Sequence, residues 1–215
     1  MAKKEVSTTQ KDAKPWRSLE KPLAWILVIG GTIGLASAFV ITWDKMKLLE
    51  NTGFQPNCDL NPIISCGSVM KTAQSHAFGF PNPWIGLAAF AVLIAVGMGI
   101  FAGGRFKRWF WIGLQLGTIF GLAFVHWLFF QSVYRINALC PYCMAVWVVV
   151  ITTFWYTLLY NLEQGHVKLP AGDAWQKTGN FIRKHHLDIL VLWLVIIAVL
   201  ILKHFWYYYG HYFGA

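Results

Sequence analysis

The feature that most constrains this chain is a series of five apolar runs that contain almost no charged residues. They are Leu23–Trp43, Pro83–Gly104, Trp109–Tyr134, Pro141–Leu162 and Leu187–Tyr209. A helix of about 20 residues crosses the hydrocarbon core of a bilayer, which is about 30 Å thick. Only 13% of the residues are charged, whereas soluble domains carry about 25%. The sequence therefore predicts an all-α integral membrane protein with five transmembrane helices.

Polar segments flank these runs and define the expected organisation. They are an N-terminal tail (residues 1–22), a long loop (44–82) and a basic loop (163–186). Within the long loop, apolar residues recur at helical spacing from Ser65 to Phe78, which predicts a short amphipathic helix at the membrane interface. The net charge of +9 comes from basic residues that flank apolar runs. Because they form no continuous basic face, the pattern favours membrane topology over nucleic-acid binding.

The Lys and Arg residues divide unevenly between the two predicted sides. The tail, the turn at Arg105 and the 163–186 loop hold 13 of them, and the opposite side holds 5. Cytoplasmic loops carry an excess of these residues, so the N-terminus is predicted in the cytoplasm and the C-terminus outside. All four cysteines then lie on the extracytoplasmic side. A cleaved signal peptide is the competing interpretation of Ala36-Ser37-Ala38, but the apolar run is too long and continues past it.

Two cysteines, Cys140 and Cys143, stand in a Cys-Pro-Tyr-Cys sequence directly at the start of an apolar run. This spacing places both sulfurs on one face of the first helical turn, where unpaired N–H groups and the helix dipole stabilise a thiolate. A thiolate attacks disulfides, and a stabilised thiolate is also a good leaving group. The pattern is typical of thiol–disulfide exchange. An inert structural disulfide or a pair of buried thiols is the alternative.

The other two cysteines, Cys58 and Cys66, lie in the long loop on the same predicted side. We expect this loop to swing across the outer surface, so that a disulfide there takes electrons from a soluble dithiol and exchanges with the Cys140/Cys143 pair. A zinc site of four thiolates is the metal alternative. The separation of Cys58 and Cys66 is wider than the two to four residues usual within structural zinc pairs, so we predict no metal.

Electrons that reach Cys143 need an acceptor within the lipid. The chain has no Gly-rich nucleotide loop, no haem-type Cys-x-x-Cys-His and no iron–sulfur cysteine run. A lipid-soluble quinone needs only an apolar pocket between helices and one or two polar anchors. Asn82 is placed to hydrogen-bond a quinone carbonyl, and Trp147, one turn after Cys143, is placed to wall the pocket. An ordinary helix cap and an interfacial aromatic residue are the alternative roles.

Glycines and one histidine stand out within the apolar runs. The series Gly113, Gly117 and Gly121, and the pair Gly30 and Gly34, predict close helix packing. The only ionisable residue deep in a run is His126, which is unusual in lipid. We expect a packed and hydrogen-bonded histidine, with a role in proton or quinone chemistry as the alternative.

Three motifs together resemble the vitamin K epoxide reductase family in its bacterial, disulfide-generating form. They are Cys58-Asp59-Leu60 through Ile64-Ser65-Cys66, Asn82-Pro83-Trp84-Ile85-Gly86 and Cys140-Pro141-Tyr142-Cys143. The resemblance covers residues 23–162 and implies a four-helix catalytic bundle around a quinone, either ubiquinone or menaquinone. The fifth transmembrane helix and C-terminus (187–215) are additional to that bundle. The resemblance also implies a multi-pass protein of the bacterial plasma membrane.

Carried onto this sequence, the resemblance implies an electron path. Cys58 receives electrons from a partner, Cys66 passes them to Cys140, and Cys143 faces the quinone, which Asn82 anchors. Two positions depart from the family pattern: Thr72 replaces a serine of many relatives, and Trp147 replaces a tyrosine of animal members. Some bacterial relatives carry a fused thioredoxin-like domain. This chain stops shortly after its fifth run, so the implied partner is a separate extracytoplasmic thioredoxin-fold dithiol oxidase similar to DsbA.

The resulting hypothesis is a quinone-dependent thiol–disulfide oxidoreductase. Vitamin K epoxide or quinone reduction proper, with the same cysteines and a different acceptor, stays open as a second function. A non-enzymatic membrane scaffold with structural disulfides is the third.

Overall fold

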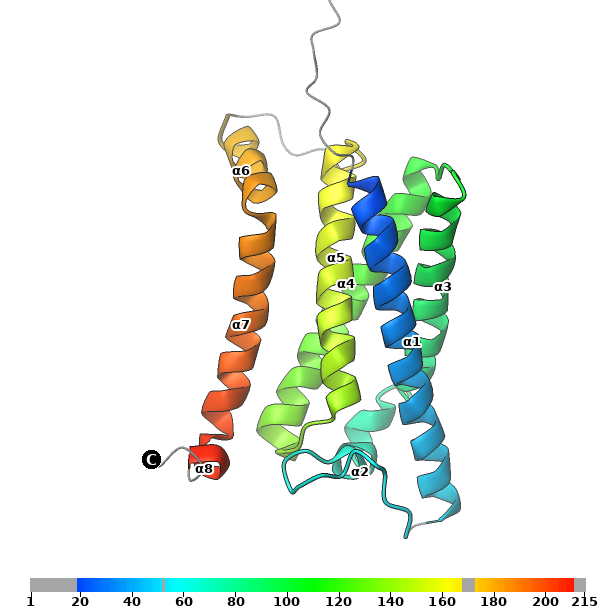
Figure 1. Cartoon of the computed structure of the whole chain (residues 1–215), viewed down its shortest axis with the longest axis vertical. Coiled ribbons are helices and arrows are strands. Elements are labelled where there is room, and N and C mark those ends of the chain that lie inside the picture. The colour runs from blue at the N-terminus through cyan, green and yellow to red at the C-terminus, as the bar shows by residue number, and fades with distance from the viewer. Residues whose placement is uncertain (1–18, 52, 168–172, 211–215) are drawn as a thin grey trace, which may run out of the picture.

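The computed structural model describes residues 19–51, 53–167 and 173–210, and these form an almost entirely helical protein (Figure 1). Most of the predicted N-terminal tail, residues 1–22, lies outside the described residues. Within the described part of the chain there is no strand, although Ile64 and Leu139 form an isolated parallel β-bridge. The all-α class predicted from the sequence is confirmed.

Within the residues that the structure describes, five helices are long and apolar enough to cross a membrane. They are α1 (Glu20–Glu50), α3 (Pro83–Phe101), α4 (Arg108–Gln131, continued by the π-helical turn η2, Ser132–Ile136), α5 (Pro141–Glu163) and α7 (His186–His204). The shorter helices are α2 (Cys66–Met70), η1 (Ala73–His76), α6 (Asp173–Lys184) and α8 (Trp206–Tyr209). In Figure 1, α2 and α8 lie at one end of the bundle, and α6 and the start of α1 lie at the other.

Three element boundaries differ from the sequence prediction. Helix α1 continues through residues 44–50, which the sequence places in the long loop, because Leu48 extends the buried face of the helix beyond Ile41. The single interfacial helix predicted from Ser65 to Phe78 is wrong, since α2 and η1 are separate. They are interrupted at Thr72, whose backbone is extended and whose hydroxyl donates to Val69 O. The basic loop contains helix α6.

Among the described helices, α1 and α3 make the most extensive contact, and glycines allow their approach. A Cβ atom added at Gly34 would lie 2.6 Å from the ring of Phe90, and one at Gly31 would lie 2.8 Å from Ile94. Neither position tolerates a side chain without movement of its neighbour. The close packing predicted for Gly34 is therefore confirmed. Helix α5 packs against both α1 and α4 and completes the bundle.

The fifth helix, α7, is largely exposed on its lipid-facing sides and is attached to the bundle by a few specific contacts. Trp193 Nε1 donates a hydrogen bond to His126 Nε2 at 3.2 Å, and His126 Nδ1 lies 2.9 Å from Leu122 O. At the first residue of α7, Trp155 Nε1 donates to His186 O at 2.9 Å. The prediction that His126 is packed and hydrogen-bonded is confirmed, and its partner is the fifth helix.

Candidate functional site

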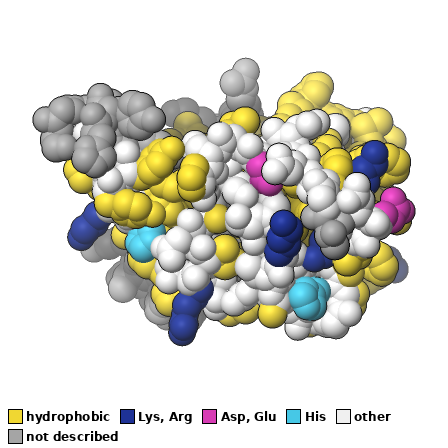
Figure 2. Space-filling model, turned by 90° about the horizontal axis from the view of Figure 1, so that it is seen from below, with side chains coloured by type: hydrophobic (Ala, Val, Ile, Leu, Met, Phe, Trp, Pro, Cys, Tyr) yellow, Lys and Arg dark blue, Asp and Glu magenta, His cyan; other side chains and the backbone are white. Residues whose placement is uncertain are grey.

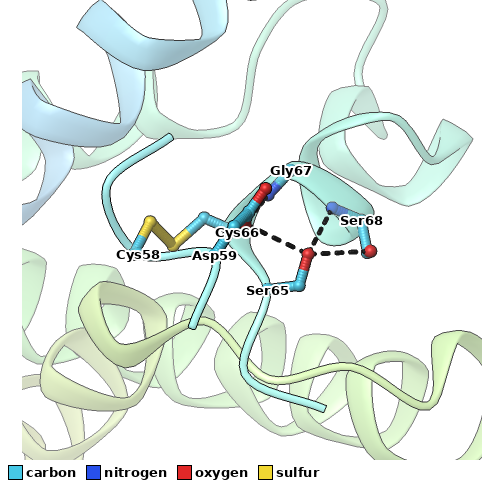
Figure 3. Close-up of a disulfide and its surroundings, with 6 residues drawn as sticks. All are labelled: Cys58, Asp59, Ser65, Cys66, Gly67 and Ser68. Atoms are coloured by element: carbon cyan, nitrogen blue, oxygen red, sulfur yellow. Dashed lines mark hydrogen bonds between the residues drawn. A yellow bond between two sulfur atoms is a disulfide. The ribbon is translucent and has the colours of Figure 1, made fainter. Parts of the chain in front are cut away.

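The cysteines of the long loop are joined in a closed turn. Cys58 and Cys66 form a disulfide with their Cα atoms 5.7 Å apart. The Asp59 carboxylate accepts hydrogen bonds from Gly67 N at 2.8 Å and from Ser65 Oγ at 3.1 Å (Figure 3). A Cβ atom at position 67 would lie 2.6 Å from Asp59 Oδ2, so this approach requires glycine. The aspartate and glycine therefore hold the two cysteines in register independently of the sulfur–sulfur bond.

This turn is fastened to the segment that precedes Cys140. Leu139 N donates to Ile63 O at 2.7 Å, and Ser65 N donates to Leu139 O at 3.0 Å. As a result Cys58, Cys66 and Cys140 belong to one buried cluster, which α1 completes with Ile41 and Leu48. The sequence led us to expect a loop that swings across the surface. The structure instead holds Cys66 beside Cys140, because two backbone hydrogen bonds pair residues 63–65 with Leu139.

The second cysteine pair is placed by the start of α5. Cys140 is the extended N-cap residue, and Pro141 occupies the first helical position, where its missing N–H costs nothing. A sharp turn brings the chain there from α4: Asn137 has a φ of 55°, and Ser132 Oγ donates to Ala138 O at 2.6 Å. Asparagine tolerates this left-handed conformation better than most residues. The turn delivers Cys140 to the cysteine cluster and Cys143 to the interior of the bundle.

Electrostatics distinguish Cys140 within this pair. The pKa of the Cys140 thiol is lowered, primarily because the Cys143 thiol donates a hydrogen bond to its sulfur. The backbone N–H groups of Cys143 and Tyr142 add to this effect. Burial and the negative charge of Asp44 act in the opposite direction. Cys140 is thus the sulfur whose thiolate the protein stabilises, as expected at a helix N-terminus.

An almost wholly apolar cavity of about 730 Å³ lies between α1, α3, α4 and α5 beneath α2 and η1. Its volume falls within the range of about 300–1,000 Å³ that is usual for small-molecule sites. Six of the residues predicted from the sequence line it: Cys66, Thr72, Asn82, Cys140, Cys143 and Trp147. Cys58 does not line it but is bonded to Cys66. The cavity extends along α4 to Trp109 and Phe110 at the far end of the bundle.

Comparison with known families agrees with this geometry. The sequence matches the vitamin K epoxide reductase family over residues 25–158, a range that includes all four cysteines. The chain belongs to this family. No curated protein matches it. Membership of this family indicates that the protein is a membrane oxidoreductase with a thiol–disulfide and quinone redox function.

In this member of the vitamin K epoxide reductase family, the Asn82 side chain joins α3 to the segment above the cavity. Its Nδ2 donates to Gln74 O at 2.7 Å, and its Oδ1 accepts from Ala77 N at 3.0 Å. It makes no side-chain cap for α3, so the ordinary helix-cap alternative does not apply. Thr72 also lines the cavity, but its hydroxyl proton is already used by Val69 O at 2.8 Å.

Trp147 forms part of the cavity wall and is 5% exposed. Its ring meets Phe129 edge to face, with centroids 5.5 Å apart. The cluster around it includes Leu139 and Phe205, and Phe205 is fully buried. Phe205 follows the fifth helix and lies beyond the residues that match the vitamin K epoxide reductase family. The fifth helix therefore supports the turn before Cys140, a contact that no sequence signal indicated.

Two glycines of α4 serve the cavity and not helix packing. A Cβ atom added at Gly113 or Gly117 would meet nothing within 4 Å, and both residues line the cavity. The sequence-based prediction of a packing ridge is therefore wrong for these two positions. The spacing of the glycines could not distinguish the two cases, because a glycine allows either the close approach of another helix or an open cavity wall. At Gly121 a Cβ would make an ordinary contact of 3.4 Å with Val150.

Lys45 is a further residue that sequence analysis did not single out. Its ammonium group donates to Met70 O, and to Ser75 Oγ at 3.3 Å. It thereby ties the end of α1 to α2 and η1, which cover the cavity. A lysine at the end of an apolar run is common at membrane interfaces, so its sequence position carries no signal for this contact. Figure 2 views the molecule from this end, with charged, histidine and hydrophobic side chains interspersed.

Proposed function

We propose that this protein is a quinone-dependent thiol–disulfide oxidoreductase that oxidises an extracytoplasmic thioredoxin-fold dithiol. One observation carries the proposal. Cys66 and Cys140 lie in the same buried cluster, and Cys143, one turn deeper, lines the apolar cavity. This arrangement supports a relay with an outer disulfide for a protein partner, an inner dithiol, and an acceptor within the bundle.

The cavity suits a quinone with an apolar tail. Its outer end holds Asn82 and Cys143, and its wall continues past Gly113 and Gly117 toward Phe110. One N–H of the Asn82 amide is used by Gln74 O, and the other is the group that would hold a quinone carbonyl. Thr72 suits this role less well, because its proton is directed to Val69 O. A quinone bound here supplies a two-electron, two-proton acceptor.

The outer exchange begins at the loop disulfide. A partner thiolate attacks Cys58, the Cys58–Cys66 bond breaks, and Cys66 leaves as a thiolate. The partner's second thiolate then attacks the partner's first sulfur, which is bonded to Cys58 in the mixed disulfide, and Cys58 leaves. The partner leaves oxidised, and Cys58 and Cys66 are left reduced. Asp59 retains the turn in this reduced state, because its hydrogen bonds to Gly67 N and Ser65 Oγ do not depend on the disulfide.

The inner exchange moves the same two electrons to the helix pair. Cys66 attacks Cys140 of a Cys140–Cys143 disulfide, and Cys143 leaves. Cys58 then attacks Cys66, which restores the loop disulfide and releases Cys140. The products are an oxidised loop and a reduced helix pair. Cys140 and Cys143 re-form their disulfide when two electrons pass to the acceptor.

The test is quinol formation by the purified protein in lipid nanodiscs with a reduced thioredoxin-fold oxidase and a quinone. We expect Cys143→Ala to abolish quinol formation, and Val148→Ala, an exposed position on the same helix, to leave it unchanged. A Cys58→Ala/Cys66→Ala protein should lose turnover with the protein partner and keep turnover with a small membrane-permeant dithiol. Normal turnover by Cys143→Ala would overturn the proposal.

A further inference from the structure

Asp44 of α1 is a buried carboxylate that the electron path above leaves without a role. Its residue is 9% exposed, and it makes no hydrogen bond or ion pair with any residue that the structure describes. Removing an ionised carboxylate from water without a partner is unfavourable. Its oxygens are not among the fully buried side-chain atoms that lack a partner in the described part of the chain, so they keep some contact with water. Partly desolvated titratable groups of this kind gather at functional sites.

The position of Asp44 on α1 directs it toward the cysteines. Ile41, Asp44 and Leu48 are buried on one face of the helix, three and four residues apart. Ile41 and Leu48, on either side, pack in the cluster that contains Cys58, Cys66 and Cys140. The negative charge of Asp44 is close enough to Cys140 to oppose ionisation of its thiol. Asp44 therefore lies on the helix face that packs against the sulfurs that exchange.

The charged groups around Asp44 have other partners. On its own helix, Lys45 donates to Met70 O and Ser75 Oγ. Lys47 Nζ lies over the Trp43 ring, 5.2 Å from its centroid.

From the long loop, Asp59 is held by Gly67 N at 2.8 Å. From the start of α5, the titratable groups beside the cluster are Cys140, Cys143 and Tyr142. Neither lysine forms an ion pair with Asp44 among the residues that the structure describes, although the positive charge of Lys47 and the negative charge of Asp59 both act on it.

We propose that Asp44 is the proton acceptor for the loop thiol in the inner exchange, an inference that rests on the proposed function. As Cys66 attacks Cys140, its proton passes to the Asp44 carboxylate, the Cys66–Cys140 bond forms, and Cys143 leaves as a thiolate. Cys58 then attacks Cys66, releasing its own proton to water at the outer face, and the Cys66–Cys140 bond breaks. Asp44 gives its proton to the helix pair, where Cys140 and Cys143 share it in their hydrogen bond. Two electrons move from the loop sulfurs to the helix sulfurs, and no external reagent is needed.

A base is required at this point because the thiolate, and not the thiol, is the nucleophile. Cys66 is fully buried, so its proton has no direct route to solvent. A positioned acid–base group contributes about 10²–10⁴-fold to such a proton transfer. Asp44 is the carboxylate on the α1 face that packs against this cluster.

The test follows the exchange alone, without quinone. Protein with an oxidised helix pair is mixed with a membrane-impermeant dithiol that reduces the loop, and a Cys58→Ala/Cys66→Ala protein measures any direct reduction of the helix pair by that dithiol. Rapid acid quenching, alkylation and mass spectrometry then time the appearance of reduced Cys140 and Cys143. We expect Asp44→Asn to slow this step about 10²-fold at neutral pH. The wild-type rate should fall as the pH is lowered and Asp44 becomes protonated. The deficit of the variant should narrow near pH 8.5, about where a free thiol ionises unaided.

Two variants and one further measurement make the result decisive. Glu50→Gln, which removes an exposed carboxylate from the same helix, should leave the rate unchanged, and Asp44→Glu should restore part of it. Alkylation of Cys140 should become faster in Asp44→Asn, because a nearby negative charge has been removed. A purely electrostatic role of Asp44 predicts that the exchange accelerates together with the alkylation. The proposal predicts that exchange slows while alkylation accelerates.

Exchange at the wild-type rate in Asp44→Asn would overturn the inference, and so would equal slowing in Glu50→Gln. A different result would overturn the proposed function: quinol never forms, although the exchange proceeds and depends on Asp44. Thermal unfolding of each variant verifies that the compared proteins are folded.

Discussion

At the scale of single residues, the start of α5 makes two chemically identical thiols unequal. Cys140 is the N-cap residue, and its sulfur receives hydrogen bonds from Cys143 and from backbone N–H groups. Cys143 lies within the first turn and lines the cavity. Spacing and helix polarity predicted a stabilised thiolate at this helix start, and the family resemblance implied that Cys140 meets the loop cysteines while Cys143 faces the quinone. The structure adds that the donor that most stabilises the Cys140 thiolate is the other thiol.

This asymmetry predicts how Cys140 responds to pH. Because its pKa is lowered, Cys140 is deprotonated at a lower pH than a free thiol, and its alkylation should remain fast as the pH falls toward neutrality. In Cys143→Ala the main hydrogen-bond donor is lost, so the pKa of Cys140 should rise and its alkylation rate at pH 7 should drop severalfold. Cys143→Ser keeps an O–H donor and should drop less. Rates of iodoacetamide labelling between pH 5 and 9 measure this, and equal rates in the two variants would contradict it.

At the scale of helices, glycines with the same spacing do two different things. Gly34 of α1 allows contact with Phe90, whereas Gly117 of α4 borders open space in the cavity. The sequence identifies both as small residues within apolar helices. It does not say whether a neighbouring helix or a ligand fills the space beside each one, because that depends on which helices become neighbours.

The two glycines should therefore respond oppositely to alanine. Gly34→Ala places a methyl group 2.6 Å from the Phe90 ring and should lower stability by about 1–3 kcal/mol through overpacking. Gly117→Ala meets no atom within 4 Å and should leave stability unchanged or slightly higher. Thermal unfolding in detergent compares the stabilities of the two variants.

Gly117→Leu should remain folded and raise the KM for a long-tailed quinone. An unchanged KM would argue against a quinone tail that lies along this wall of the cavity.

The fifth helix is expected to matter for catalysis through Phe205. Truncation of a fully buried phenylalanine costs about 3–5 kcal/mol when the cavity does not collapse, and Phe205 is 0% exposed in the cluster with Leu139 and Trp147. Phe205→Ala should loosen the turn before Cys140 and lower both unfolding temperature and quinol formation. Tyr207→Ala, at a residue 64% exposed, is the matched control. Equal effects of the two substitutions would show that the cluster does not support the site.

Sequence analysis reached some of these features and not others, for physical reasons. Five apolar runs predicted five membrane helices, because hydrophobic length is a local property. The four cysteines and Asn82 were found because their chemistry and order are visible in the chain. Contacts between distant residues were not visible. The pairing of Leu139 with Ile63 and the burial of Phe205 depend on tertiary packing, and neither leaves a periodic or compositional signal.

At the scale of the whole molecule, the fold brings both cysteine pairs to the end of the bundle formed by α2 and the start of α5. Helix α8 lies at the same end, away from the start of α1 (Figure 1). Which compartment that end faces decides what the relay can do. On an oxidising side, the loop disulfide meets secreted dithiols, whereas in the cytoplasm glutathione and thioredoxin would keep it reduced. The 13-to-5 bias of Lys and Arg predicts that the cysteine end faces outward.

This orientation is testable with single cysteines in a protein whose four native cysteines are replaced by serine. Leu60 is 70% exposed in the cysteine turn, and Phe181 is 59% exposed on α6 at the opposite end. In intact spheroplasts, a membrane-impermeant maleimide should label Leu60→Cys and leave Phe181→Cys unlabelled until the membrane is permeabilised. Labelling of both before permeabilisation would indicate leaky membranes. The reverse pattern would place the cysteines in the cytoplasm. The loop disulfide would then be exposed to cytoplasmic thiols, and the relay would have no secreted dithiol to oxidise.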